Sequence, residues 1–145
     1  MATNLTPEQM KQLVRSHFED FVNKRNAEVI YKNMTSDFYD HDGPGGKPTD
    51  AKGDEQMMTA MYKLMPDLHL TIEEMIAEGD KVASRFEWAG THQHEFLGVP
   101  ATGRQVRVWG VVIDRLEEGR IKDTRIIMDM LGLMMQLGVF PSPSA

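Results

Sequence analysis

The sequence predicts an α+β domain in which helices precede an antiparallel sheet. Three observations support this class. Apolar residues recur at helical spacing up to about residue 65, the spacing changes to strict alternation from Leu68 onward, and glycine-containing turns separate the alternating runs. Helices and strands are segregated along the chain, which excludes a doubly wound α/β fold. We therefore expect helices packed on a curved, mixed but mostly antiparallel sheet of about four to six strands.

Three helices are expected in the first half of the chain. They span residues 7–24, 26–34 and 50–65. The first begins with a capping signature, in which Thr6 is the N-cap, Pro7 takes the first helical position and Gln9 follows the cap by three residues. Pro66 ends the third helix because proline cannot continue the hydrogen-bond ladder.

Strands and one short helix are expected in the rest of the domain. The extended segments are residues 38–42, 68–72, 82–88, 106–113 and 121–128. Tight turns at residues 78–80 and 118–119 join neighbouring strands. Asp129 is expected to cap a terminal helix. We expect one domain over residues 1–140 and a frayed tail over residues 141–145.

Composition excludes several classes of function. The chain has 145 residues, a net charge of −6 and scattered basic residues, which argues against a nucleic-acid partner. It has no cysteine, hence no disulfide or thiolate site, and no apolar run long enough for a membrane span or signal peptide. A cytoplasmic location is the expectation. The 12 methionines suit an irregular core or an adaptable lipophilic pocket.

Three glycine-marked segments carry a family resemblance. They are Gly90-Thr91-His92, Gly98-Val99-Pro100-Ala101-Thr102-Gly103-Arg104 and the ending from Asp129 to Gly138. In this order and spacing the chain resembles the SnoaL-like polyketide cyclases of the nuclear-transport-factor-2-like superfamily. The resemblance implies a cone-shaped sheet with three N-terminal helices over its concave face and one internal pocket.

The function implied by the resemblance is cofactor-independent acid/base chemistry. The substrate would be a small apolar carbonyl compound or a polyketide-like molecule, and the reaction an aldol cyclisation or an isomerisation. The alternatives are a non-catalytic protein that binds a lipophilic small molecule on the same fold, or an enzyme similar to epoxide hydrolases. In the cyclases a strand carboxylate and a histidine move the proton, and the corresponding positions here are Ile126 and Val112.

A more distant similarity to limonene epoxide hydrolase points to Arg85 and Glu87 as catalytic residues. Those enzymes carry an Arg-x-Asp pair on a middle strand, and residues two apart share a strand face. If that face is the pocket, a carboxylate beside a guanidinium could bind or deprotonate a carbonyl compound. A structural ion pair on the outer face is the alternative.

Other candidates complete the expected site. His41 and Asp129 are the further catalytic candidates, although Asp129 also suits the helix cap. The expected substrate-binding residues are Asp42, Met57, Met61, Phe86, His92, Val108, Val112 and Ile126. His92 and His94 with Glu95 provide too few ligands on one face for a metal, so no metal is expected and His92 instead fixes its loop. Apolar residues on both strand faces, including Trp109, favour a homodimer packed sheet to sheet.

Overall fold

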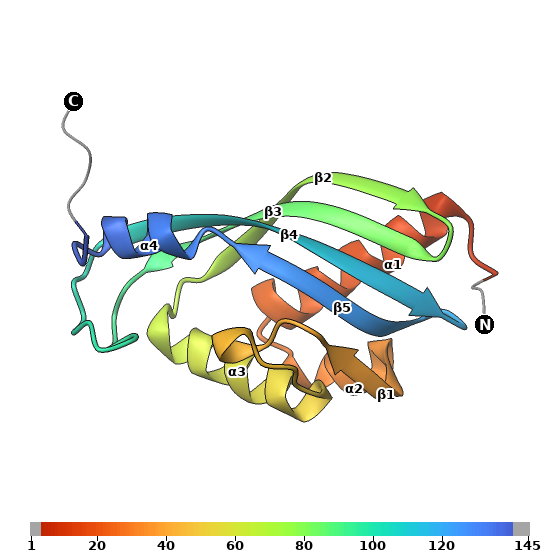
Figure 1. Cartoon of the computed structure of the whole chain (residues 1–145), viewed down its shortest axis with the longest axis horizontal. Helices are drawn as coiled ribbons and strands as arrows, with labels where there is room; N and C mark the ends of the chain where they lie inside the picture. Colours follow the sequence, from red (N-terminus) through yellow and green to blue (C-terminus); the bar gives the residue numbers. More distant parts are fainter. Residues whose placement is uncertain (1–3, 141–145) are drawn as a thin grey trace.

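The domain is built around a five-stranded, curved sheet in the computed structural model, which describes residues 4–140 (Figure 1). The strand order is β1-β5-β4-β3-β2. The strands are β1 (Met34–Asp40), β2 (His69–Glu78), β3 (Lys81–Thr91), β4 (Gln105–Glu117) and β5 (Arg120–Met128). Only the β1–β5 pair is parallel among them. The α+β class and the mostly antiparallel sheet are confirmed.

Helices α1, α2 and α3 lie on one side of this sheet, and α4 lies at one end of it (Figure 1). Their bounds are α1 (Pro7–Phe18), α2 (Ile30–Asn33), α3 (Ala51–Leu64) and α4 (Met130–Gln136). A π-helical turn over Glu19–Asn23 extends α1, and 3-10 turns cover Ala27–Val29 and Pro44–Gly46. The expected second helix is therefore a 3-10 turn followed by a single α turn. The expected tail of residues 141–145 lies outside the described residues.

Side-chain caps fix where the helices begin. The hydroxyl of Thr6 accepts a hydrogen bond from the Gln9 amide at 3.1 Å, and the Gln9 side chain accepts one from the Thr6 amide at 2.9 Å. This reciprocal capping box satisfies amides that have no partner inside the helix. Asp50 caps α3 and Asp129 caps α4, each through one 2.9 Å hydrogen bond that its carboxylate accepts, from the amides of Gly53 and Gly132 respectively. The expected caps of the first and terminal helices are confirmed.

The sheet has an inner face, toward the helices, and an outer face. On β3 the buried residues Val82, Ser84, Phe86 and Trp88 alternate with more exposed ones, so they mark the inner face. On β4 the inner residues are Val106, Val108, Gly110, Val112, Asp114 and Leu116. A Cβ at Gly110 would come within 2.7 Å of the Phe86 ring, so glycine makes room for that ring.

The main core lies between this inner face and the helices. It joins Phe21 and Met58 of the helical layer to Phe86, Val108 and Val112 of the sheet. A smaller core packs α1 against the far ends of β3 and β4 through Met10, Val14, Val82 and Leu116. None of the helices in residues 4–140 is long and apolar enough to cross a membrane.

Candidate functional site

Three aspartates are buried where the main core meets β1, α3 and β4. Asp40 ends β1, Asp54 lies in the first turn of α3 and Asp114 lies on the inner face of β4; their exposed fractions are 4%, 7% and 2%. Carboxyl groups are rarely buried without a cationic partner. We call these three residues the carboxyl cluster.

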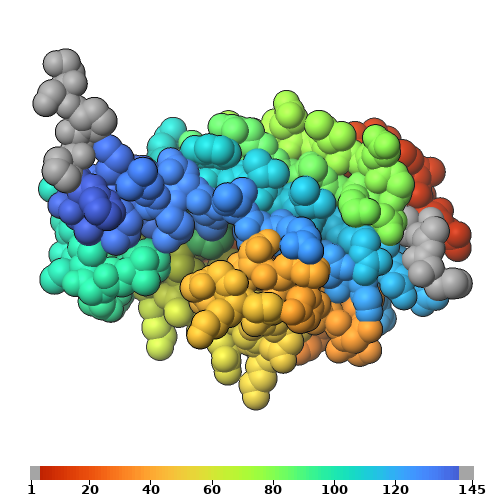
Figure 2. Space-filling view, in the orientation of Figure 1, coloured from red at the N-terminus to blue at the C-terminus, as the bar shows by residue number. Residues whose placement is uncertain are grey.

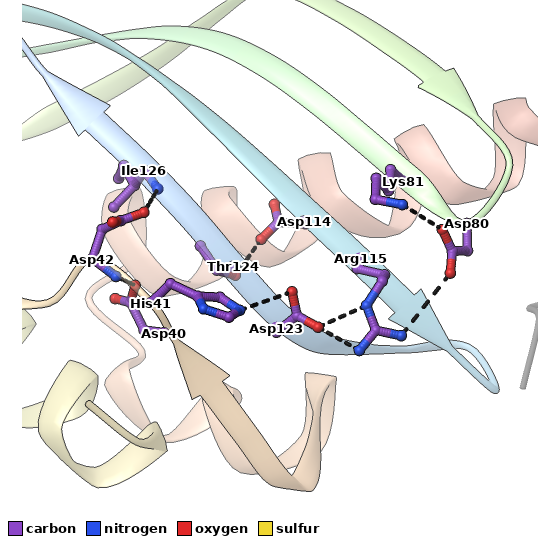
Figure 3. Close-up of polar contacts among 10 residues, drawn as sticks. All are labelled: Asp40, His41, Asp42, Asp80, Lys81, Asp114, Arg115, Asp123, Thr124 and Ile126. Atoms are coloured by element: carbon purple, nitrogen blue, oxygen red, sulfur yellow. Dashed lines mark hydrogen bonds and ion pairs between the residues drawn. The ribbon is translucent and has the colours of Figure 1, made fainter. Parts of the chain in front are cut away.

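Backbone and side-chain hydrogen bonds hold the cluster in place. The Thr124 hydroxyl donates to Oδ1 of Asp114 at 2.6 Å, and the amide of Asp42 donates to Oδ1 of Asp40 at 2.9 Å (Figure 3). The parallel pairing of β1 with β5 sets Asp40 opposite Thr124. In the space-filling view the segment near residue 40 (orange) lies directly against β5 (blue) (Figure 2). Thr124 of β5 therefore lies between Asp40 of β1 and Asp114 of β4, and β1 is distant from both of these strands in the sequence.

Burial and mutual repulsion raise the pKa values of two of these carboxyl groups. Burial is the largest cause of the rise in the pKa of Asp54 to about 8, followed by the charge of Asp40 and a hydrogen bond to its side chain. Burial also raises the pKa of Asp114 to about 7, although the hydrogen bond from Thr124 opposes the rise. A hydrogen bond between two carboxyl groups needs a proton on one of them, and we place that proton on Asp54.

Three buried polar atoms in or beside the carboxyl cluster have no hydrogen-bond partner within residues 4–140. They are Oδ1 of Asp54, Oδ2 of Asp114 and the hydroxyl oxygen of the neighbouring Ser84. Ser84 is fully buried on the inner face of β3, where it pairs with Val112 and lies diagonal to Asp114. A protonated acid, an acid that titrates near neutral pH and a free hydroxyl therefore lie together in an apolar surrounding. Such a set can donate and accept protons.

The positions expected for the proton-transfer residues lie beside the cluster. Val112 pairs with Ile126 across β4 and β5, and Ser84 pairs with Val112 on the other side. The next pair along the same face is Asp114 with Thr124. The buried acidic side chain here is therefore Asp114 on β4, which lies diagonal to the expected carboxylate position at Ile126 on β5.

The expectation that Arg85 and Glu87 face an inner pocket is wrong. Both alternate with the buried residues of β3 and so lie on the outer face. The Arg85 guanidinium is 3.7 Å from a Glu73 carboxylate oxygen and 4.5 Å from the centre of the Trp109 ring, while Glu87 is 3.6 Å from Arg107. These are exposed or half-exposed ion pairs. Their placement also removes the basis for an epoxide-hydrolase-like reaction.

His41, Asp42 and Asp129 lie outside the carboxyl cluster, and each has a structural contact. Nε2 of His41 is 3.4 Å from Asp123, whose side chain points to the opposite face of β5 from Thr124 (Figure 3). Asp42 is exposed, and its carboxylate accepts a hydrogen bond from the Ile126 amide at 3.0 Å. Asp129 serves as the cap of α4. None of the three places a side chain among the buried carboxyl groups.

The ring of His92 fixes its loop, as expected. Nδ1 lies 2.9 Å from the Thr102 hydroxyl and accepts a bond from the Thr102 amide at 3.2 Å, so the ring proton resides on Nε2. That Nε2 is buried without a partner in the described chain.

Most of the residues expected to bind substrate belong to the main core. Phe86, Val108 and Val112 are buried, Met61 and Ile126 pack against them, and Met57 is half-buried. No group of three metal-ligating side chains converges within residues 4–140. One surface hollow, lined by Asp37, Glu117, Arg120 and their neighbours, includes no member of the carboxyl cluster.

Each carboxyl of the cluster interrupts an apolar pattern that the sequence displays. Asp114 follows Val108 and Val112 at even spacing on β4, and Asp54 precedes Met58 by four residues on the buried stripe of α3. Asp40 shares a face with Phe38. An aspartate at a core position of a periodic element is the signal that identifies this site from sequence.

Comparison with known proteins agrees with this fold. A sequence model of the SnoaL-like polyketide cyclase family matches residues 12–137. Aklanonic acid methyl ester cyclase DnrD of Streptomyces peucetius is 32% identical over 83 residues, which is 57% of this chain and 57% of that enzyme. The match thus spans little more than half of the cyclase.

Solved structures resemble the chain over almost its whole length. AclR of Streptomyces galilaeus, provisionally described as a hydroxylase, superposes with a TM-score of 0.83 at 26% identity and covers 94% of this chain and 100% of its own. IdmH of Streptomyces antibioticus, provisionally described as a polyketide cyclase, gives 0.80 at 28% identity, with 90% and 99% covered. Similar folds thus carry different assigned reactions, and the residues of the site must decide between them.

Proposed function

Because this chain belongs to the SnoaL-like polyketide cyclase family, we propose that it removes a proton beside a carbonyl group and closes a ring by an intramolecular aldol step. The substrate class is a polyketide-like carbonyl compound, and no cofactor takes part. The observation that carries the proposal is the pair of buried carboxyl groups, Asp54 and Asp114, with pKa values raised toward neutral. The likeness to a methyl ester cyclase supports the substrate class.

In the proposed mechanism Asp114 is the base and Asp54 the acid. Ionised Asp114 takes the proton from the carbon beside the carbonyl through its free Oδ2, and the C–H electron pair forms an enolate. The enolate carbon attacks a second carbonyl carbon of the same molecule, and Asp54 donates its proton to the oxygen that becomes a hydroxyl. Asp40 shares a hydrogen bond with Asp54 and its charge also raises the pKa of Asp114, so we assign to Asp40 the return of the proton from Asp114 to Asp54.

Ser84 is assigned to the developing negative charge. Its buried hydroxyl has no other partner in the described residues, and Ser84 lies diagonal to Asp114 across β3 and β4. A fixed donor in a dry, apolar surrounding stabilises an enolate oxygen far better than the same group in water.

The experiment is hydrogen–deuterium exchange at the carbon beside the carbonyl of 2-tetralone, a bicyclic aromatic ketone, followed by NMR. We expect the wild-type protein to accelerate exchange and Asp114→Asn to lower the rate by at least about 100-fold. Asp123→Asn is the control, because this carboxylate lies on the outer face of the same strand pair and pairs with Arg115 and His41. Equal rates for Asp114→Asn and wild type would refute the assignment.

The competing function, binding of a lipophilic molecule without catalysis, has one observation in its favour. The expected proton-transfer positions Val112 and Ile126 are apolar and lie on the inner face. Binding of 2-tetralone without any acceleration of exchange would favour this function.

We also propose that a second copy of the chain covers the outer face. Ile127, Trp109 and Ile113 leave 71%, 43% and 39% of their surface exposed there. Basic and acidic residues, including Arg85 and Glu87, share the same face, so two copies can pair opposite charges. Sedimentation equilibrium of wild type and Ile127→Glu tests this: a dimer that the substitution dissociates is expected, and a wild-type monomer refutes it.

A further inference from the structure

Trp88 presents a buried hydrogen-bond donor that nothing in the described chain satisfies. The residue is 8% exposed on the inner face of β3, and its indole Nε1 is buried without a hydrogen-bond partner among residues 4–140. An indole N–H can only donate, and buried tryptophans usually find an acceptor. An unpaired buried donor in a native fold calls for an explanation.

Trp88 lies on the same face of β3 as Ser84, the residue beside the carboxyl cluster. Ser84 and Trp88 lie on the same face of one strand and are four residues apart, so their Cα atoms are about 13 Å apart. Ser84 adjoins the cluster, whereas the residues between and beside the two are apolar: Phe86 on the same strand, Val108 on β4 and Leu70 on β2. An apolar strip thus has polar groups at both ends.

We infer that Trp88 donates a hydrogen bond to an oxygen acceptor at the end of the substrate remote from the reacting carbonyl. The inference rests on the proposed function, which places the reacting end at the carboxyl cluster. Because the donor is neutral and has no acceptor capacity, the partner is a carbonyl, ether or hydroxyl oxygen. The substrate is then an extended carbonyl compound oxygenated at both ends. A small ketone with a single oxygen cannot engage both groups.

The chain offers a direct spectroscopic test because it contains only two tryptophans. A ¹⁵N-labelled protein therefore gives two indole N–H signals, and Trp109→Phe assigns them. The probes are 2-hydroxyanthraquinone and 2,6-dihydroxyanthraquinone, which differ only in the hydroxyl at the far end. We expect the second probe, and not the first, to move the Trp88 indole proton signal downfield, as a new hydrogen bond does. The signal of the exposed Trp109 should stay in place.

Binding measurements on Trp88→Phe complete the test. This variant keeps an aromatic ring and loses the donor, so it should bind 2,6-dihydroxyanthraquinone about 10-fold more weakly than wild type does. Its affinity for 2-hydroxyanthraquinone should remain that of wild type. Trp109→Phe, the matched control, should leave both affinities unchanged.

The outcomes separate this inference from the proposed function. An unmoved Trp88 signal on binding, with normal 2-tetralone exchange, overturns the role of Trp88 and leaves the carboxyl mechanism standing. Loss of exchange in Asp114→Asn together with the expected shift supports both. Failure of both probes to bind and of wild type to accelerate exchange overturns both.

Discussion

Replacing Asp114 with asparagine should stabilise the protein at neutral and alkaline pH. Burial opposes ionisation of this side chain and raises its pKa from 3.8 to about 7. An unfolded chain ionises the carboxyl at low pH, whereas the folded protein retains the proton until near neutrality. The free energy of unfolding therefore falls as pH rises from about 4 to about 7, because the unfolded state binds fewer protons over this range. Asparagine has the same shape and never ionises.

The size of the effect follows from the shift in pKa. A rise from 3.8 to about 7 corresponds to roughly 4 kcal/mol of unfolding free energy once the pH exceeds both values. The amide keeps an oxygen for the Thr124 hydroxyl but adds a buried N–H group that needs a partner, which costs about 1–3 kcal/mol. We expect a net gain of about 2 kcal/mol near pH 8 and a net loss near pH 4.

Urea unfolding followed by tryptophan fluorescence measures this difference at several pH values. The free energy of unfolding of Asp114→Asn, minus that of wild type, should increase as pH rises. Asp123→Asn is the control: its carboxylate is half-buried on the outer face and paired with Arg115, and its charge is the smallest of the causes that raise the pKa of Asp114. Its loss should change stability by less than about 1 kcal/mol, with a much weaker dependence on pH than Asp114→Asn shows. If this difference in unfolding free energy stays constant or decreases from about pH 5 to about pH 8, the reasoning is refuted.

Three further substitutions test the assignment of roles. Thr124→Val removes a hydrogen bond that lowers the pKa of Asp114, so the alkaline rise of the 2-tetralone exchange rate should move to higher pH; an unchanged pH–rate profile contradicts this. Arg85→Ala and Glu87→Gln alter exposed pairs on the outer face and should leave the exchange rate at the wild-type value, so a large loss in either would return them to the site. Asp129→Ala should lower the unfolding free energy by about 1 kcal/mol through the lost cap, as thermal denaturation would show, with no change in exchange.

Periodicity in the sequence was sufficient to predict the helices, the sheet and their order. The expected caps at Thr6 and Asp129 are present because such side chains satisfy amides within their own turn, a purely local interaction. The second helix is shorter than expected, since residues 27–29 form a 3-10 turn that α2 continues for only one turn.

The site was harder to predict because it depends on which face of β3 is buried. Arg85 and Glu87 alternate with residues of which Ser84 is polar, so the pattern alone allowed either face to line a pocket. The face that is buried carries Ser84 and Trp88, because these residues pair with the apolar Val112 and Val108 of β4. This pairing depends on strand register, which the local sequence of β3 does not reveal. The cluster joins β1, α3 and β4, and no short motif contains all of its members.

The parallel contact between β1 and β5 has a consequence for how the protein matures. Asp42 and Ile126, joined by a hydrogen bond across this contact, are separated by 84 positions in the chain. Hairpins β2–β3 and β3–β4 can form early through local closure, but the β1–β5 contact must wait for the last strand. Thr124 can meet Asp114 within the local β4–β5 hairpin, but it reaches Asp40 only when β1 joins β5. Partly folded chains therefore lack Asp40 beside the other two carboxyl groups, and the proposed activity should be acquired late, together with closure of the sheet edge.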